Sequence, residues 1–125
     1  MATWTSDELD RIGDATELDL QSARDDGTLR DPVTMWVVRV GDELFVRSMN
    51  GPDGAWYRGT QTRRQGRVTA GGVTKDVAFD DADHNLDADI DEVYRTKYQR
   101  YGANIIGGVV NPASRDATIK LTPRS

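Results

Sequence analysis

Residues 44–79, LFVRSMNGPDGAWYRGTQTRRQGRVTAGGVTKDVAF, are the stretch that decides how this chain folds. The first six residues have the apolar, β-branched and aromatic content of a strand, and the run 50–54 contains two glycines and a proline that force a turn. A predicted helix over 55–64 follows, and then two strands, 67–70 and 73–79, joined by a glycine pair. A helix that begins after such a turn presents free backbone N–H groups and the positive end of its dipole. We therefore expect a phosphate or carboxylate site at this turn.

The composition limits the classes of protein to which the chain can belong. Its 125 residues suffice for one domain, 1–125, with a single hydrophobic core. The lack of cysteine excludes disulfides, thiolate metal sites and a cysteine nucleophile. The net charge of −5 argues against a broad nucleic-acid-binding or membrane-binding surface. The N-terminus lacks the pattern of a signal peptide and no apolar run approaches the roughly 18 residues of a membrane span, so we expect a cytoplasmic protein.

The hydrophobic pattern predicts further elements on both sides of this stretch. A capping box formed by Thr5 and Glu8 begins a short helix near Ser6. Apolar and polar residues alternate over 17–21, which indicates a strand with one buried face. The remaining predictions are an exposed loop at 25–32, a hairpin of strands 33–40 and 43–49 around Gly41 and Asp42, a helix with an apolar stripe from Ile90 to Tyr101 that ends at Gly102, a packed loop or short helix at 104–112, and a final strand at 117–122.

Polar residues near the predicted strand ends are candidates for a binding site. Arg47 and Ser48 point to opposite faces of a strand, so they share a pocket only where the strand ends, and the alternative for Arg47 is a surface salt bridge. Lys75 lies on the same predicted strand face as Val77 and Phe79. Because an unpaired ammonium among apolar side chains is costly, Lys75 should meet a carboxylate, a phosphate or solvent at the strand edge.

Aromatic and basic residues at the start of the predicted helix form a second candidate group. Trp56 and Tyr57 are residues of a core or interface that can also border a planar ligand, with the tyrosine hydroxyl as a donor. Arg58 would flank a phosphate at the helix start or lie on the exposed side of the helix. Aromatic and basic groups also occur together in proteins that bind single-stranded nucleic acid, but the acidic balance of the chain argues against that function.

The acidic segment from Asp81 to Glu92 is a weaker candidate. His84, the single histidine, has no serine or second histidine nearby, so we expect an exposed loop histidine rather than a catalytic or zinc-binding one. The acids follow the spacing of a calcium loop, but Leu86 stands where that loop needs glycine. We therefore predict acids that favour a helix N-terminus, and no metal site.

The order helix, strand, hairpin, helix, hairpin, helix and final strand resembles the split β-barrel that binds flavin or deazaflavin cofactors, as in pyridoxamine phosphate oxidase-like proteins and deazaflavin-dependent nitroreductases. Over its full length the chain also resembles an uncharacterised bacterial family, domain of unknown function 2255. The residues that carry this resemblance are 44–48, 50–51, 56–57, 66–70, 74–77, 90–98 and 117–124. The resemblance implies an α+β fold, an antiparallel split β-barrel of about six strands with short flanking helices. It also implies a homodimer, because cofactor sites in that superfamily lie at the subunit interface.

The resemblance also implies a cofactor site. Ser48 and Gly51 match the serine and glycine of a Ser-Lys-x-Gly sequence that ends a strand in the nitroreductases, and Met49 stands at the position of the lysine. The predicted cofactor-binding residues are Arg47, Ser48, Gly51, Trp56, Arg58 and Lys75, and Tyr57 is the predicted catalytic proton donor. The implied function is an oxidoreductase-like protein that binds FMN or a deazaflavin coenzyme. The alternative is a non-redox small-molecule-binding or scaffold protein that has lost the cofactor.

Overall fold

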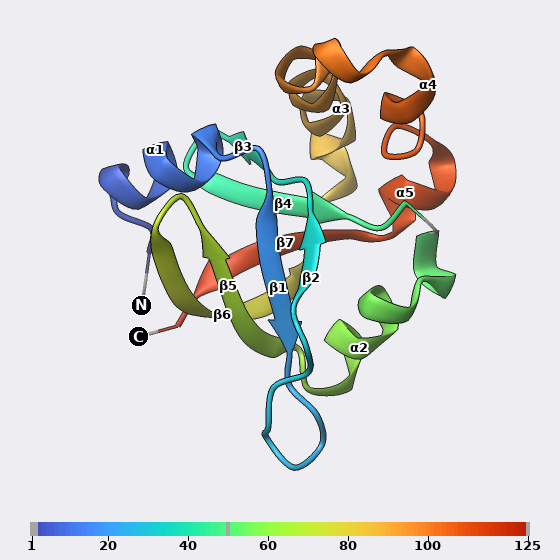
Figure 1. Ribbon diagram of the computed structural model, residues 1–125. Helices are drawn as coiled ribbons and strands as arrows, with labels where there is room; N and C mark the ends of the chain where they lie inside the picture. The colour runs from blue at the N-terminus through green and yellow to red at the C-terminus, as the bar shows by residue number, and fades with distance from the viewer. Residues whose placement is uncertain (1–2, 50, 125) are drawn as a thin grey trace.

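The computed structural model describes residues 3–49 and 51–124, and the arrangement of its elements is drawn in Figure 1. The helices within these residues are α1 (Ser6–Asp14), α2 (Ala55–Arg63), α3 (Asp87–Lys97), α4 (Ala103–Ile106) and α5 (Pro112–Asp116). The strands are β1 (Leu18–Ser22), β2 (Val33–Met35), β3 (Val38–Val40), β4 (Glu43–Arg47), β5 (Gln65–Ala70), β6 (Val73–Asp81) and β7 (Thr118–Pro123). They form one antiparallel sheet in the order β2-β1-β5-β6-β7-β4-β3.

The sheet curls into a barrel because one extended segment, residues 33–40, supplies both of its edges. β2 pairs with β1 on one side, and β3 pairs with β4 on the other. Trp36 and Val37 lie between the two short strands, where the chain passes from one edge to the other. The sequence predicts one continuous strand here, and the structure corrects this prediction because the pairing partner changes within the segment. β2 therefore does not pair with β4, and the barrel is open between them. With β2 and β3 taken as one bent strand, the predicted split barrel of about six strands is confirmed.

Two apolar clusters hold the fold together on the two faces of the curled sheet. Alternate residues of β4 illustrate the division, since Leu44 and Val46 face the barrel interior while Phe45 packs outward under α3. The interior cluster also takes in Leu9 and Ile12 of α1, which closes one end of the barrel. The cluster under α3 contains Val38, Phe45, Ile90, Tyr94, Tyr98, Ile106 and Val109.

The predicted helix starts and turns are mostly present. Thr5 and Glu8 form both hydrogen bonds of the capping box that begins α1. The helix predicted from Ile90 to Tyr101 is shorter than expected, since α3 ends at Lys97 and residues 99–101 form a separate 3₁₀ turn. The packed segment at 104–112 contains α4, and α5 was not predicted. The two ends of the described chain lie together near α1, whereas α2 and α5 lie at the opposite end of the barrel (Figure 1).

Candidate functional site

A cavity of about 310 Å³ lies in the opening between β2 and the end of β4, and we call it the split cavity. Its lining includes Val33 and Trp36 from the segment 33–40, Arg47 and Met49 from the end of β4, and Trp56 from α2. The Trp36 ring stacks on Tyr98, with 3.9 Å between ring centroids and an interplanar angle of 5°. The cavity therefore combines two tryptophans with a position where a sheet edge is unpaired.

Arg47 lies at the base of this cavity, and its side chain is 0% exposed. Its Nε donates to Thr118 Oγ1 at 2.9 Å, and its Nη1 donates to the Val109 carbonyl at 2.9 Å and to Asp91 Oδ1. Asp87 Oδ1 is 3.7 Å from Nη2. Two carboxylates of α3 thus surround the guanidinium, so its charge is already balanced within the protein.

Asp91 joins Arg47 to a second arginine, Arg115 of α5. Arg115 donates to Asp91 Oδ2 from Nη2 at 2.7 Å and from Nε at 3.1 Å. Burial by itself raises the pKa of the Asp91 carboxyl, but hydrogen bonds from Arg115 and Arg47 outweigh it and hold that pKa below its ordinary value. Asp91 therefore stays ionised and ties α3, α5 and β4 together behind the split cavity.

Ser48, the residue after Arg47, contributes a hydroxyl with no partner. Its side chain is 1% exposed, and Oγ is buried without a hydrogen bond to any described residue. The hydroxyl of Tyr94, whose ring lies 5.6 Å from the Arg47 guanidinium carbon, is buried and unpartnered in the same sense. Burial raises the pKa of Tyr94 strongly, so this hydroxyl keeps its proton. Unpartnered buried polar atoms of this kind call for a water or ligand atom nearby.

A second hollow of about 400 Å³ shares Val33 and Trp56 with the split cavity, and we call it the adjoining hollow. Ser22, Arg24 and Arg30 line it from β1 and the loop that follows. The same lining includes Asp31 and the first residue of α2, Ala55. The β1–β2 loop reaches α2 directly, because Arg30 Nη1 donates to the Gly59 carbonyl at 3.4 Å and Arg63 Nη1 donates to the Asp25 carbonyl at 2.7 Å.

The sequence predicts an anion site at the start of α2. The N-terminus of this helix has no side-chain cap, but Gly51, the glycine predicted to bind the ligand, has a different role. Gly54 is the N-cap and provides no side-chain cap. Gly51 has a φ of 64°, and a Cβ placed there would lie 2.9 Å from the Cβ of Ala113 in α5. Gly51 is therefore needed for the packing of α5 and for a left-handed backbone.

The remaining candidates on α2 lie outside both linings. Arg58 is exposed, and Tyr57 is half-buried with its ring edge-on to Trp56 at 6.3 Å between centroids. Burial, followed by the negative charge of Asp81, raises the pKa of Tyr57 above its ordinary value, so its hydroxyl is protonated at neutral pH.

The structure does not bring Lys75 and Arg47 together, although the sequence-based hypothesis of one anion site needs both. Arg47 pairs with Thr118, whose neighbour in β7 pairs with Asp81, and Lys75 precedes Asp81 by six residues of β6. Six residues of extended strand span about 20 Å. Lys75 instead borders a separate hollow, with its Nζ 3.5 Å from Glu8 Oε2. This ion pair with α1 explains a lysine on an otherwise apolar strand face.

Residues 8–121 match the sequence profile of a family described as "uncharacterized protein conserved in bacteria", DUF2255. The chain belongs to the DUF2255 family. No curated protein matches it. Within the part of this DUF2255 chain that the structure describes, no helix is both long and apolar enough to cross a membrane.

Solved structures with the same fold include three cofactor-related proteins. An F420 reductase is 16% identical, with a TM-score of 0.58 and coverage of 94% of the DUF2255 chain and 93% of its own. An FAD-binding protein from Mesorhizobium loti is 13% identical, with a TM-score of 0.60 and coverage of 99% and 93%. The haem storage protein HutZ from Vibrio cholerae is 13% identical, with a TM-score of 0.61 and coverage of 99% and 92%. At these identities the likeness establishes the split-barrel fold of the DUF2255 chain.

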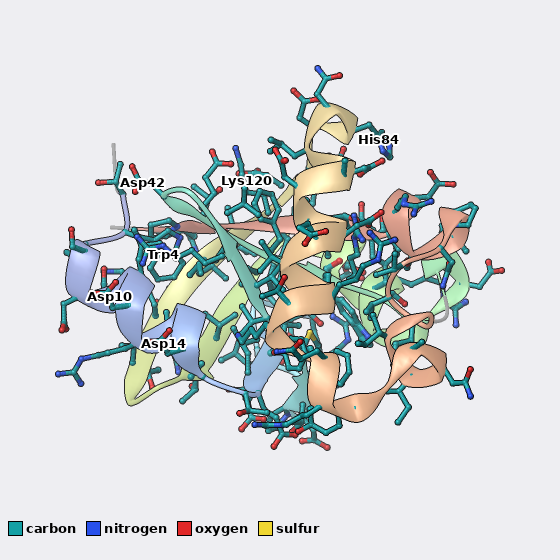
Figure 2. The ribbon with its side chains drawn as sticks, turned by 90° about the horizontal axis from the view of Figure 1, so that it is seen from above. Trp4, Asp10, Asp14, Asp42, His84 and Lys120 are labelled. Carbon is teal, nitrogen blue, oxygen red and sulfur yellow. The ribbon has the colours of Figure 1, made fainter. Side chains whose placement is uncertain are left out.

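Another hollow lies at the other end of the barrel, and its lining contains none of the predicted site residues. Its volume is about 470 Å³, and its lining includes Trp4, Asp42, Glu43 and Lys120. Figure 2 shows Trp4, Asp42 and Lys120 at the α1 end of the DUF2255 chain, with His84 at the far end of α3. Trp4 uses its Nε1 to donate to the Leu121 carbonyl at 2.9 Å, which is a packing role.

The acidic segment of the DUF2255 chain is dispersed among separate partners. Asp81 pairs with Arg64, and Asp83 caps the turn before α3. His84 is exposed, as predicted, and its Nδ1 lies 2.9 Å from Asp87 Oδ2. The hydrogen bond with Asp87, followed by the charge of that carboxylate, raises the pKa of His84. The segment therefore caps and anchors α3.

Sequence reasoning missed several residues that line the two hollows, namely Trp36, Val109, Arg24 and Arg30. Trp36 had a signal, because it is a tryptophan within a β-branched run, although its place between β2 and β3 is known only from the structure. Arg24 and Arg30 flank a loop for which the sequence predicts only exposure to solvent. The fold of the barrel is what brings this loop next to α2.

Proposed function

We propose that this chain binds a flat, conjugated cofactor of the flavin or deazaflavin type in the split cavity and acts as an oxidoreductase. The observation that carries this proposal is the split cavity itself, which Trp36 and Trp56 line together with the buried guanidinium of Arg47. Aromatic walls with a few fixed polar groups are typical of sites for planar ligands. The names of the three solved structures, with F420, FAD and haem, support a cofactor of this class.

The residues present fit the ring system of such a cofactor better than they fit its anionic tail. Trp36 and Trp56 offer two aromatic side chains in the lining, whereas the unpartnered hydroxyl of Ser48 is buried next to Arg47 in the chain and is not part of that lining. Arg47 holds the base of the cavity in place, but Asp91 and Asp87 already balance its charge. We therefore assign Arg47 to positioning, and we assign ring contact to Trp36 and Trp56.

The cofactor, when bound, would supply the electron transfer, and the protein would supply orientation and protons. Trp36, fixed by its stacking on Tyr98, and Trp56 would hold the ring and exclude water from it. Tyr57 lies outside the lining but packs edge-on to Trp56 and is protonated at neutral pH, so it is the candidate proton donor beside the ring wall. Tyr57→Phe should leave the cofactor Kd unchanged. It should also slow reduction of an artificial electron acceptor by the reduced, cofactor-loaded protein by about 10²-fold.

Titration of the purified full chain with FMN, deazaflavin coenzyme and haem, followed by fluorescence and absorbance, tests the proposal. Binding of one of them should quench tryptophan fluorescence, and Trp56→Leu should weaken that binding, since stacking on an aromatic ring contributes roughly 1–3 kcal/mol per base in comparable sites. Lys75→Met separates the sequence-based hypothesis from the geometry, because a lysine about 20 Å away should not change the affinity. Failure of all three ligands to bind at micromolar concentration would contradict the proposal.

The second candidate function is a non-redox small-molecule-binding or scaffold protein on the same barrel. Two observations favour it: Met49 stands at the mouth of the split cavity where the resembled motif has a lysine, and the neighbouring Arg47 is neutralised. Binding of uncharged planar compounds, without flavin or deazaflavin binding, in the same titration would select this function.

The proposal includes a homodimer, and a cytoplasmic location stays a prediction. Val33 and Met49 are large apolar residues that are 37% and 57% exposed at the split cavity. A second copy that covers this edge would remove them from water and deepen the site. Sedimentation velocity should therefore report a dimer, and a Met49→Asp variant should shift it toward monomer. A monomeric wild type would contradict this part of the proposal.

A further inference from the structure

We propose that the adjoining hollow binds the anionic end, a phosphate or carboxylate group, of the ligand whose ring lies in the split cavity. This inference rests on the proposed function and adds the chemistry and position of the ligand's tail. The two hollows share Val33 and Trp56, so a ligand can pass from one to the other around the indole of Trp56. The groups assigned to the tail are Arg24, Arg30 and Ser22.

The first argument is the balance of charge around the arginines. Arg47 in the split cavity is paired with two carboxylates, so it offers little attraction to an anion. Arg24 and Arg30 donate only to uncharged oxygens in the described part of the chain, and neither forms an ion pair there. Guanidinium groups that line a hollow without an ion-pair partner attract phosphate and carboxylate groups, which match their planar donor geometry.

The second argument is that Arg30 is held in place before any ligand arrives. Its Nη1 donates to the Ala23 carbonyl at 2.9 Å, to Ser22 Oγ at 3.3 Å and to the Gly59 carbonyl at 3.4 Å. Nε and Nη2 form no hydrogen bond with a described residue. One edge of the guanidinium is thus fixed between β1 and α2, and the remaining donors are available to a ligand. A donor that is already ordered loses little conformational entropy on binding.

The third argument concerns the nearby carboxylates. Asp26 accepts hydrogen bonds from the hydroxyl and the backbone N–H of Thr28, and these bonds, with a smaller contribution from the charge of Arg24, lower its pKa. Asp26 therefore offsets part of the charge of Arg24 without forming an ion pair with it. Asp31 is in the lining of the hollow. Two arginines against one carboxylate leave the lining positive, although the whole chain carries a charge of −5. The hollow is therefore a positively charged region in a protein whose net charge is negative.

Calorimetric titration of the full chain with FMN and with riboflavin tests the tail site, because the two compounds share one ring system and only FMN carries a phosphate. FMN should bind about tenfold more tightly than riboflavin, the effect of one hydrogen bond to a charged group. Arg24→Gln should remove most of that preference and leave riboflavin binding unchanged. Arg30→Gln should do the same, with circular dichroism to verify folding. Arg124→Gln removes the same charge from an exposed position at the end of β7 and should keep the preference.

The possible outcomes distinguish a failure of the tail site from a failure of the proposed function. Equal affinities for FMN and riboflavin, or an Arg124→Gln variant that loses as much as Arg24→Gln, would overturn the tail site and leave the ring site standing. If neither flavin binds, and deazaflavin coenzyme and haem do not bind either, the proposed function fails, and inorganic pyrophosphate decides the tail site. Thermal stabilisation by pyrophosphate that disappears in Arg24→Gln would support it, whereas no stabilisation of the wild type would overturn it.

Discussion

Asp91→Asn should unfold this protein far more readily than its position on a surface helix suggests. The substitution keeps the shape of the side chain but leaves the Arg47 guanidinium, which is fully buried, with one carboxylate at 3.7 Å and otherwise neutral acceptors. Breaking a buried ion pair by removing one partner costs about 3–5 kcal/mol. The entropy of unfolding for 125 residues is about 0.26 kcal/mol/K, so Tm should fall by about 11–19 °C.

The assay is thermal and urea denaturation followed by circular dichroism, with two controls. Arg47→Met/Asp91→Leu removes both charges and should be less destabilising than either single change, because no unpaired charge remains buried. The pKa of Asp91 is held below its ordinary value, so its contribution is present above about pH 4 and is lost as pH falls through the lower folded-state pKa. The gap between wild type and Asp91→Asn should therefore close in acid. A loss under about 1 kcal/mol at neutral pH would refute the reasoning, since that is the range of an exposed pair.

Two further predictions concern stability. Burial lowers the pKa of Lys97 to about 8 and raises that of Tyr98 to about 12. Because the unfolded chain keeps the lysine proton longer, the free energy of unfolding should rise from about pH 8 to pH 10 and fall beyond it as unfolded tyrosines ionise. Lys97→Met should abolish the rise, and a wild type with a flat profile would contradict the assignment. Gly51→Ala should cost about 2–4 kcal/mol from backbone strain and the clash with Ala113, whereas Gly27→Ala, with a φ of 89° and open space, should cost only about 1 kcal/mol; equal losses in urea denaturation would disprove the clash.

The sequence predicted those elements whose signals are local. Thr5 and Glu8 lie within one helical turn of each other, so their capping box could be recognised without the fold. The hairpin turn at Gly41 depends on adjacent residues in the same way. The break at Trp36 could not be foreseen, because it arises from the competition of β1 and β4 for one segment. Local patterns set the strands, and the long-range pairing decided where one strand became two.

The candidate site was harder to predict because burial and charge partners are long-range properties. Arg47 ends an apolar strand, and the sequence suggested either a ligand contact or a surface salt bridge. Its ion-pair partners on α3 are 40 and 44 positions away, and only the packing of that helix on the sheet brings them together. For the same reason, the sequence made a lysine at position 75 look unfavourable on an apolar strand face. Its ion-pair partner, Glu8, lies on α1, far away in the sequence.

The distribution of paired and unpaired cations bears directly on what the barrel binds. The opening of a split barrel suits a planar ligand ring, but the opening alone does not determine which charge the ligand carries. In this chain the cation beside the ring site is neutralised by α3, and two arginines without an ion-pair partner among the described residues lie in the β1–β2 loop. A ligand that carries its negative charge on the ring itself is therefore disfavoured, whereas one with a separate anionic tail can satisfy both hollows. Comparison of FMN with riboflavin and with planar carboxylates of ring size would distinguish these two ligand classes, and preference for the compact anions would show that the charge of Arg47 is available after all.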